Sequence, residues 1–241
     1  MDKQAINKHM EENKQEQQVT NPQQPEKKPD EKGGIYLQGH IKIFDPQSGE
    51  IFVNKRNAIH YENISEAMAY SLGNKSRNFI FEMHFGNGGT TVDPTGVINY
   101  LPANTKTQNS DLYNPTFYKN VDDTSTKNLD PLRNKIEIRH VPGTVYSDVL
   151  ITCLLDYGEP NLSSPGNLAG QTQSPFDNSQ NLDSVFVFDE LGLKGYSDAG
   201  DGLGKLLTHV IFHPVQKSSN RLIQIEYTVR IQTITNLAAG G

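Results

Sequence analysis

The chain has 241 residues, of which 34% are hydrophobic, and this allows one sizeable domain with a single core and long polar loops. A formal net charge of -6 provides no broad basic surface, so composition does not support nucleic-acid binding. No stretch approaches the roughly 18 consecutive apolar residues of a membrane-spanning helix, and the N-terminus lacks the apolar core of a signal peptide. We therefore expect a soluble protein that is made in a cytoplasm.

The first 34 residues differ sharply in composition from the rest of the chain. Their few apolar side chains lie among many Gln, Asn, Glu, Lys and Pro residues, too few to offset the entropy of ordering the segment alone. A disordered tail and a short amphipathic helix over residues 2–18 are both open interpretations, and the prolines favour extended chain thereafter. We expect an arm, residues 1–34, that a neighbouring subunit holds in place. Its predicted assembly contacts are Ile6, Met10, Val19, Pro22 and Pro25.

From Ile35 onward the sequence alternates apolar and polar residues, which predicts half-buried strands. The first strand, over residues 35–43, turns through residues 45–50 into a second at 51–53, which together predict a hairpin. Further strands are expected at residues 79–85, 97–101, 135–141, 145–157, 185–188, 206–212 and 221–235. Alternation of this kind predicts that residues 35–241 form a mainly β domain, an antiparallel β-sandwich or barrel.

One short helix is expected from about Ile64 to Leu72. Asn63 is placed to cap it, Glu66 occupies the capping-box position and Gly73 ends it. The apolar residues of this segment recur at helical spacing, so the helix should pack against a sheet.

Two long polar connections, residues 102–134 and 158–183, separate the strands. Structureless loops of this length are uncommon in compact domains, so we expect either contacts with other subunits or mobile surface features. The aromatic residues of the first loop have two interpretations, as anchors of the loop or as a recognition surface for carbohydrate. These residues are Tyr100, Tyr113, Phe117 and Tyr118, and the last three are also predicted assembly contacts.

Three segments match a metal or phosphate motif only in part. His209 and His213 have the spacing of a helical metal pair, but in a strand they would lie about 13 Å apart, and no Glu follows His209. Gly86–Thr91 follows a strand as a phosphate-binding loop does, but without the Lys or the helix, so a glycine turn is favoured. Ser197–Gly202 lacks the distal Glu of a calcium loop, so a tight hairpin turn is favoured.

Candidate catalytic groups are equally incomplete. Asp122–Asp123 and Asp189–Glu190 are paired in sequence only, because neighbours along a strand point to opposite faces. Cys153 is the only cysteine and lies in an apolar run, which excludes an internal disulfide and predicts a buried, unreactive thiol. We therefore predict no catalytic residue, no metal and no cofactor. A hydrolase of host surface polymer is the least favoured class.

Five segments carry a resemblance to a known family: Lys42–Asn63, Glu82–Gly89, Leu155–Pro160, Phe188–Leu193 and His209–Lys217. They resemble a family of virion structural proteins from large tailed phages, notably phages of marine bacteria and cyanobacteria. The match would cover roughly residues 35–235 and leave the arm outside it. The resemblance implies a particle component without catalysis.

The resulting hypothesis is a structural subunit of a tailed-phage virion, in the neck, tail or baseplate, assembled in the host cytoplasm. Its expected partners are further copies in a ring and other virion proteins, with no nucleic acid and no membrane. The arm, the two long loops and the sheet edges would supply contacts through β-augmentation and arm exchange. The alternatives are a capsid decoration protein and a receptor- or carbohydrate-binding module.

Overall fold

The computed structural model describes residues 33–161, 163–168 and 185–235. Residues Gly34–Ile234 form one compact unit, and the account below concerns that unit. The expected mainly β, antiparallel architecture with one packed helix is confirmed for the described part of the chain. The arm contacts expected at Ile6, Met10, Val19, Pro22 and Pro25 lie outside the described residues.

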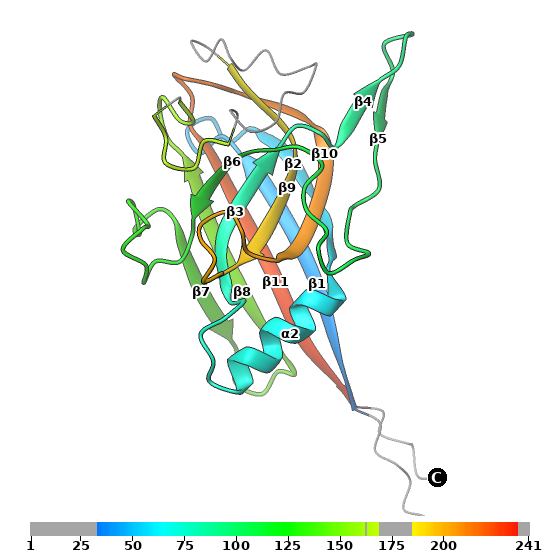
Figure 1. The fold of residues 1–241 in the computed structure, drawn as a ribbon, viewed down its shortest axis with the longest axis vertical. Helices are drawn as coiled ribbons and strands as arrows, with labels where there is room; N and C mark the ends of the chain where they lie inside the picture. Colours follow the sequence, from blue (N-terminus) through cyan, green and yellow to red (C-terminus); the bar gives the residue numbers. More distant parts are fainter. Residues whose placement is uncertain (1–32, 162, 169–184, 236–241) are drawn as a thin grey trace, which may run out of the picture. The chain divides into compact units, whose positions relative to one another are not determined.

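Strands dominate the described chain. They are β1 (Gly33–Phe44), β2 (Ile51–Ile59), β3 (Ile80–Gly86), β4 (Thr90–Val92), β5 (Ile98–Tyr100), β6 (Pro115–Asn120), β7 (Lys135–His140), β8 (Tyr146–Leu155), β9 (Val185–Gly195), β10 (Leu206–Ser218) and β11 (Ile223–Thr235). Nine of them form one sheet in the order β6-β3-β9-β10-β2-β1-β11-β8-β7, while β4 and β5 pair separately as a hairpin. The large sheet curls into a half-barrel (Figure 1).

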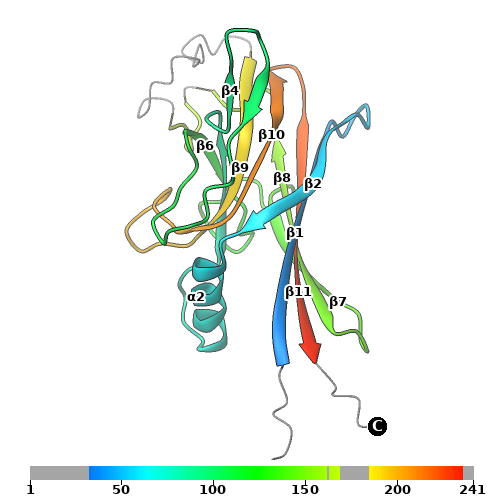
Figure 2. The ribbon, with the colours of Figure 1, turned by 90° about the vertical axis from the view of Figure 1, so that its right-hand side faces the viewer.

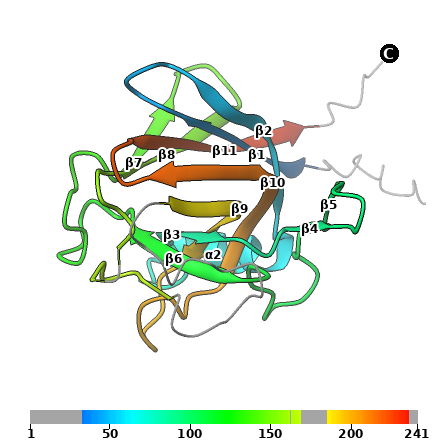
Figure 3. The ribbon, with the colours of Figure 1, turned by 90° about the horizontal axis from the view of Figure 1, so that it is seen from above.

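Strand β2 is where the sheet bends. It pairs with β1 from Gly39↔Asn57 to the Phe44↔Ile51 end, but with β10 only through Thr208↔Ile59 and His209↔Ala58. Figure 2 shows β2 crossing from one half of the sheet to the other, and Figure 3 shows β6, β3 and β9 facing β11, β8 and β7. The two halves therefore enclose a core between their inner faces.

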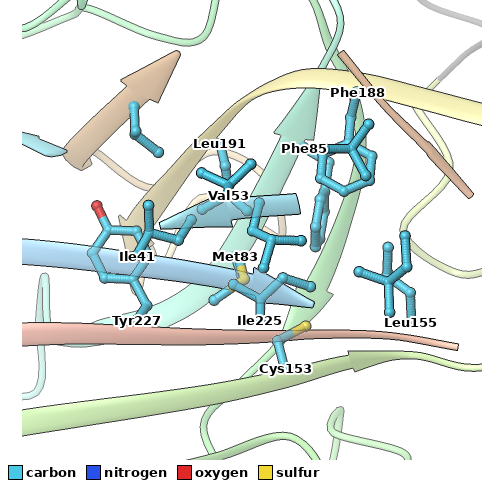
Figure 4. Packing of buried hydrophobic residues seen from close by; sticks show 14 of the residues in the cluster. Ile41, Val53, Met83, Phe85, Cys153, Leu155, Phe188, Leu191, Ile225 and Tyr227 are labelled. Carbon is cyan, nitrogen blue, oxygen red and sulfur yellow. The ribbon is translucent and has the colours of Figure 1, made fainter. Parts of the chain in front are cut away.

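The core is built from the inward residues of both halves (Figure 4). Phe85, Phe186 and Phe188 contact one another with ring centroids 5.4 to 6.4 Å apart. Tyr227 is fully buried, and its hydroxyl accepts a hydrogen bond from Asn57 Nδ2. Cys153 is also buried, as predicted, and burial raises the pKa of its thiol to about 12. This thiol is a small core side chain.

The helix, α2 (Tyr61–Leu72), begins three residues before the predicted start. Its N-cap is His60, whose Nδ1 accepts a hydrogen bond from Asn63 N at 3.3 Å, so the prediction that Asn63 caps the helix is wrong. Asn63 is buried instead, and its Nδ2 donates to Leu206 O at 2.8 Å. The predicted end at Gly73 is confirmed, and Ile64 packs into a second apolar cluster with Leu37, Ile59 and Leu207.

Several strand predictions differ from the structure. Strand β2 runs to Ile59, past the expected end at 53, and β4 begins within the segment expected to be a glycine turn. Strands β9 and β10 continue past the expected ends at 188 and 212, through charged residues that the fold nevertheless buries. Strand β6 lies inside residues 102–134, which were expected to be a loop, because Phe117 turns inward to pack on Phe85. Of the second expected loop, residues 158–168 except residue 162 are described, and the rest lies outside the described residues.

Lys217 is a charged side chain buried at one end of the core. Its Nζ donates to Ser218 O at 3.0 Å, and burial lowers its pKa from 10.5 to about 8. The folded protein therefore binds fewer protons than the unfolded chain between these two pH values, and its stability should rise with pH across that window.

We expect the free energy of unfolding of the native chain, relative to that of a Lys217→Met variant, to increase between pH 8 and 10.5. Urea denaturation of both proteins at several pH values measures this difference. Two profiles that run parallel across the window would show that the lysine titrates alike in the folded and unfolded states.

Candidate functional site

Polar side chains are buried on the outer face of strands β3, β9 and β10. Phe81, Met83 and Phe85 of β3 are buried, with Met83 and Phe85 in the main core, so the intervening Glu82 and His84 point to the opposite face. Both are buried nonetheless, as are Glu190, Lys194 and His209 on the two neighbouring strands. Buried polar groups need hydrogen-bond partners, and the connections that cover this face supply most of them; His84 Nδ1 has none among the described residues.

The carboxylate of Glu190 is the centre of this polar layer. It accepts hydrogen bonds from Gly88 N at 3.1 Å, Tyr113 N at 2.9 Å and Asn114 N at 2.8 Å. His209 lies 3.0 Å away through Nε2, while its Nδ1 accepts from Asn104 N at 2.8 Å. That second bond leaves the proton on Nε2, so His209 is a further donor to Glu190. Three separate segments are therefore fixed to β9 by one carboxylate.

Asp189 holds the segment after β3 in the same way. It accepts from Gly89 N at 2.9 Å, from Thr90 N at 2.9 Å and from Thr90 Oγ1. Burial raises the pKa of Asp189. Side chains of the protein itself thus accept hydrogen bonds from the backbone N–H groups of Gly88, Gly89 and Thr90, where a phosphate would have to bind. A Cβ at Gly88 would lie 2.8 Å from Asn114, so this is a close-packed glycine turn.

A second buried pair, Glu82 and His84, anchors the connection between β9 and β10. His84 Nε2 lies 2.9 Å from Glu82, and the Glu82 carboxylate also accepts from Gly202 N. Lys194 Nζ donates to Gly202 O at 3.1 Å and to Asp111 at 2.7 Å. Burial lowers the pKa of His84, which keeps the ring neutral. Ser197–Gly202 is thus part of a connection from 196 to 205, longer than the predicted tight turn.

The other candidate residues are held apart. His213 is exposed and bonds to Tyr100 Oη at 3.2 Å, away from the buried environment of His209. Asp122 caps the turn at Thr124, while Asp123 accepts from Ile136 N at 3.4 Å. Among the described residues no group of three or more His, Cys, Asp or Glu side chains is placed to hold a metal ion.

The aromatic residues of the first loop divide between the two interpretations. Tyr113 Oη donates to Pro102 O at 2.8 Å, and Tyr100 bonds to His213, so both anchor local structure. Phe117 is buried in the core. Tyr118 points to the opposite face of β6, stacks on His84 at 5.2 Å and lines a pocket.

This pocket has a volume of about 460 Å³, and we call it the polar pocket. Its walls come from β6, from Glu82 of β3, from residues 127–134, from residues 156 and 159, from residues 164–166 and from the β9–β10 connection. The residues that line it include Glu82, Tyr118, Lys119, Asn120, Lys127, Leu129, Asp130, Arg133, Asp156, Glu159 and Asp201. Of the residues that line it, sequence reasoning singled out Phe117 and Tyr118 as loop aromatics, and Asp201 only as part of the Ser197–Gly202 turn.

The two edges of the large sheet differ. The β6 edge is covered by the chain itself, because Tyr118 N donates to Gly166 O and Leu168 N donates to Thr116 O. The β7 edge is the end of the strand order, and in the described residues only the Asp123 contact to Ile136 N reaches it. Ile138 on this edge is 70% exposed, and Val141 and Val145 beside it are exposed too. We call these three residues and strand β7 the open edge.

The β4–β5 hairpin stands apart from the large sheet (Figures 1 and 3). Its turn is fixed by Asp93, which accepts from Thr95 N at 2.8 Å and Val97 N at 3.0 Å. Val92, Val97 and Tyr100 are exposed on it. An isolated two-stranded hairpin is marginally stable, so the Asp189 bonds at its base hold it in place.

No protein-family model, no curated protein and no solved structure matches this chain. Within the described residues, no helix has the length and apolar character needed to span a bilayer. The residues of the sites above are therefore interpreted from their own geometry.

A Glu190→Gln substitution should destabilise the fold strongly. The amide has one acceptor oxygen where the carboxylate has two, and its N–H₂ group would face backbone N–H donors. We expect the free energy of unfolding to fall by about 3 kcal/mol. Glu137→Gln on the exposed strand β7 is the matched control and should change it by less than about 0.5 kcal/mol. Equal urea midpoints for the two variants would contradict the role given to Glu190.

Proposed function

We propose that this chain is a non-enzymatic structural subunit of a tailed-phage virion, in the neck, tail or baseplate, and that it assembles with further copies and other virion proteins. The observation that carries the assembly role is the difference between the two sheet edges. A strand edge with unpaired backbone groups is a template for another chain, and proteins that stay monomeric usually cover or charge such edges. Here the chain covers β6 and leaves β7 open.

The chemistry of the open edge supports addition of a partner strand. Lys135, Glu137 and Arg139 lie on one face of β7 and pair with one another, at 2.9 Å and 3.0 Å. Ile136 and Ile138 lie on the other face of β7. Ile136 packs on the core, whereas Ile138 is exposed. A partner strand would gain backbone hydrogen bonds along β7 and apolar contacts at Ile138.

The hairpin supplies a second, separate contact surface. Its turn and base are fixed by hydrogen bonds, so little conformational entropy is lost when a partner binds it. Exposed apolar residues on a rigid projection suit insertion into a neighbouring subunit. Membership of a phage particle is supported by the resemblance of the five sequence segments and by the composition of residues 1–34.

Ile138→Lys should weaken assembly while leaving the fold intact. The substitution places a charge where the partner would bury an apolar side chain, so we expect the association constant of the full chain to fall about tenfold or more. Light scattering coupled to size-exclusion chromatography measures it. Leu72→Lys, at an 87% exposed position on α2, is the control and should assemble normally. Unchanged assembly of Ile138→Lys would exclude the open edge as a contact.

Removal of residues 1–34 tests the arm separately. We expect the shortened chain to unfold cooperatively, because the compact unit spans Gly34–Ile234, but to be missing from particles. Incorporation into particles is measured by complementing a phage that lacks the gene. Particles that form normally with the shortened chain would rule out assembly through the arm and leave the open edge to be judged by Ile138→Lys.

A further inference from the structure

We propose that the polar pocket binds a neutral, polyhydroxylated ligand of the size of one saccharide unit. Its volume of about 460 Å³ lies within the range of roughly 300–1,000 Å³ that is usual for small-molecule sites. Every residue named for the pocket belongs to the compact unit, so the site is complete in one chain. The inference goes beyond the assembly role and does not rest on it.

All three cationic side chains that line the pocket are paired with carboxylates, and five carboxylates line it in total, so among the described residues no lining cation is left for an anionic ligand. Lys119 pairs with Glu159 at 2.6 Å, and Lys127 pairs with Asp201 at 2.5 Å. Arg133 bridges Asp130 and Asp156, the latter at 2.6 Å. An anionic ligand would have to break one of these pairs to find a counter-charge. A neutral ligand would leave the pairs intact and use the lone pairs that the carboxylates retain.

One polar atom in the wall has no partner among the described residues: Asn120 Oδ1 is a buried acceptor without a donor. Tyr118, which also lines the pocket, carries a hydroxyl group two residues earlier on β6. The side chains of Tyr118 and Asn120 are on the same face of the strand. An acceptor beside a hydroxyl suits a ligand that carries several hydroxyl groups.

The ring of Tyr118 provides the apolar part of the site. One face stacks on His84 with an interplanar angle of 17°, which fixes the ring in orientation. Glu82, which lines the pocket, bonds to the same histidine, so the wall behind the ring is rigid. The C–H groups of a sugar ring pack on an aromatic surface of this kind, while its hydroxyl groups reach Asn120 and the paired carboxylates.

Saturation-transfer NMR on the full chain tests the proposal. The probes are glucose, galactose, mannose and N-acetylglucosamine, with glucuronate as the charged counterpart. We expect saturation transfer to at least one neutral probe, with a Kd of ~1 mM, and weaker transfer to glucuronate. Asn120→Leu should raise the Kd about tenfold, because it removes the acceptor, and Tyr118→Ala should abolish detectable transfer.

Two further variants make the result decisive. Tyr118→Phe keeps the stack on His84 and removes only the hydroxyl, so it should raise the Kd severalfold if the fold is unchanged by circular dichroism. Tyr61→Ala, an exposed tyrosine on α2 outside the pocket, should bind as the native chain does. The proposal is overturned if no neutral probe shows transfer, if transfer survives Asn120→Leu and Tyr118→Ala, or if glucuronate binds as well. Because the assay needs no assembled particle, a negative result leaves the open edge untouched.

Discussion

The buried carboxylate of Glu190 is the interaction on which the outer layer of the half-barrel depends. A charge removed from water on this face would be costly, and it is stable because four donors surround it. Those donors belong to the turn after β3, the connection before β6 and strand β10, so satisfying one charge positions three segments. Asp189, the next residue back, holds the base of the β4–β5 hairpin. The direction in which the hairpin projects thus follows from two consecutive carboxylates in β9.

The two edges of the sheet differ in whether the chain itself covers them. On the β6 side, residues 166–168 supply the backbone partners that the edge needs, and the sheet ends there. On the β7 side the strand remains exposed, and its ion pairs lie on one face where they do not block the backbone. Exposed ion pairs of this kind contribute little to stability. Their position on one face leaves the backbone groups of β7 accessible to the partner strand that we propose.

Much of the fold follows from alternation, because period-two patterning directly reports a half-buried strand. Residues 223–235 and the first hairpin are predictable for that reason. The pattern fails where the buried side chains are charged. Glu190, Lys194 and Lys217 are buried within strands, but charged residues at these positions of the sequence suggest that the strand has ended. The prediction of the helix N-cap is also wrong. His60 is the N-cap in the structure, although Asn, the residue type at position 63, has the stronger propensity for that position. Asn63 is needed elsewhere, bonding to Leu206 O across a tertiary contact that no local pattern reports.

The polar pocket could not be predicted, because its walls come from segments far apart in the chain and its cations meet their carboxylate partners only in the folded chain. One of these segments, residues 121–134, also leads into β7, so the wall and the open edge are continuous. Asp123 contacts Ile136 at that edge, while Arg133 joins the pocket wall to Asp156.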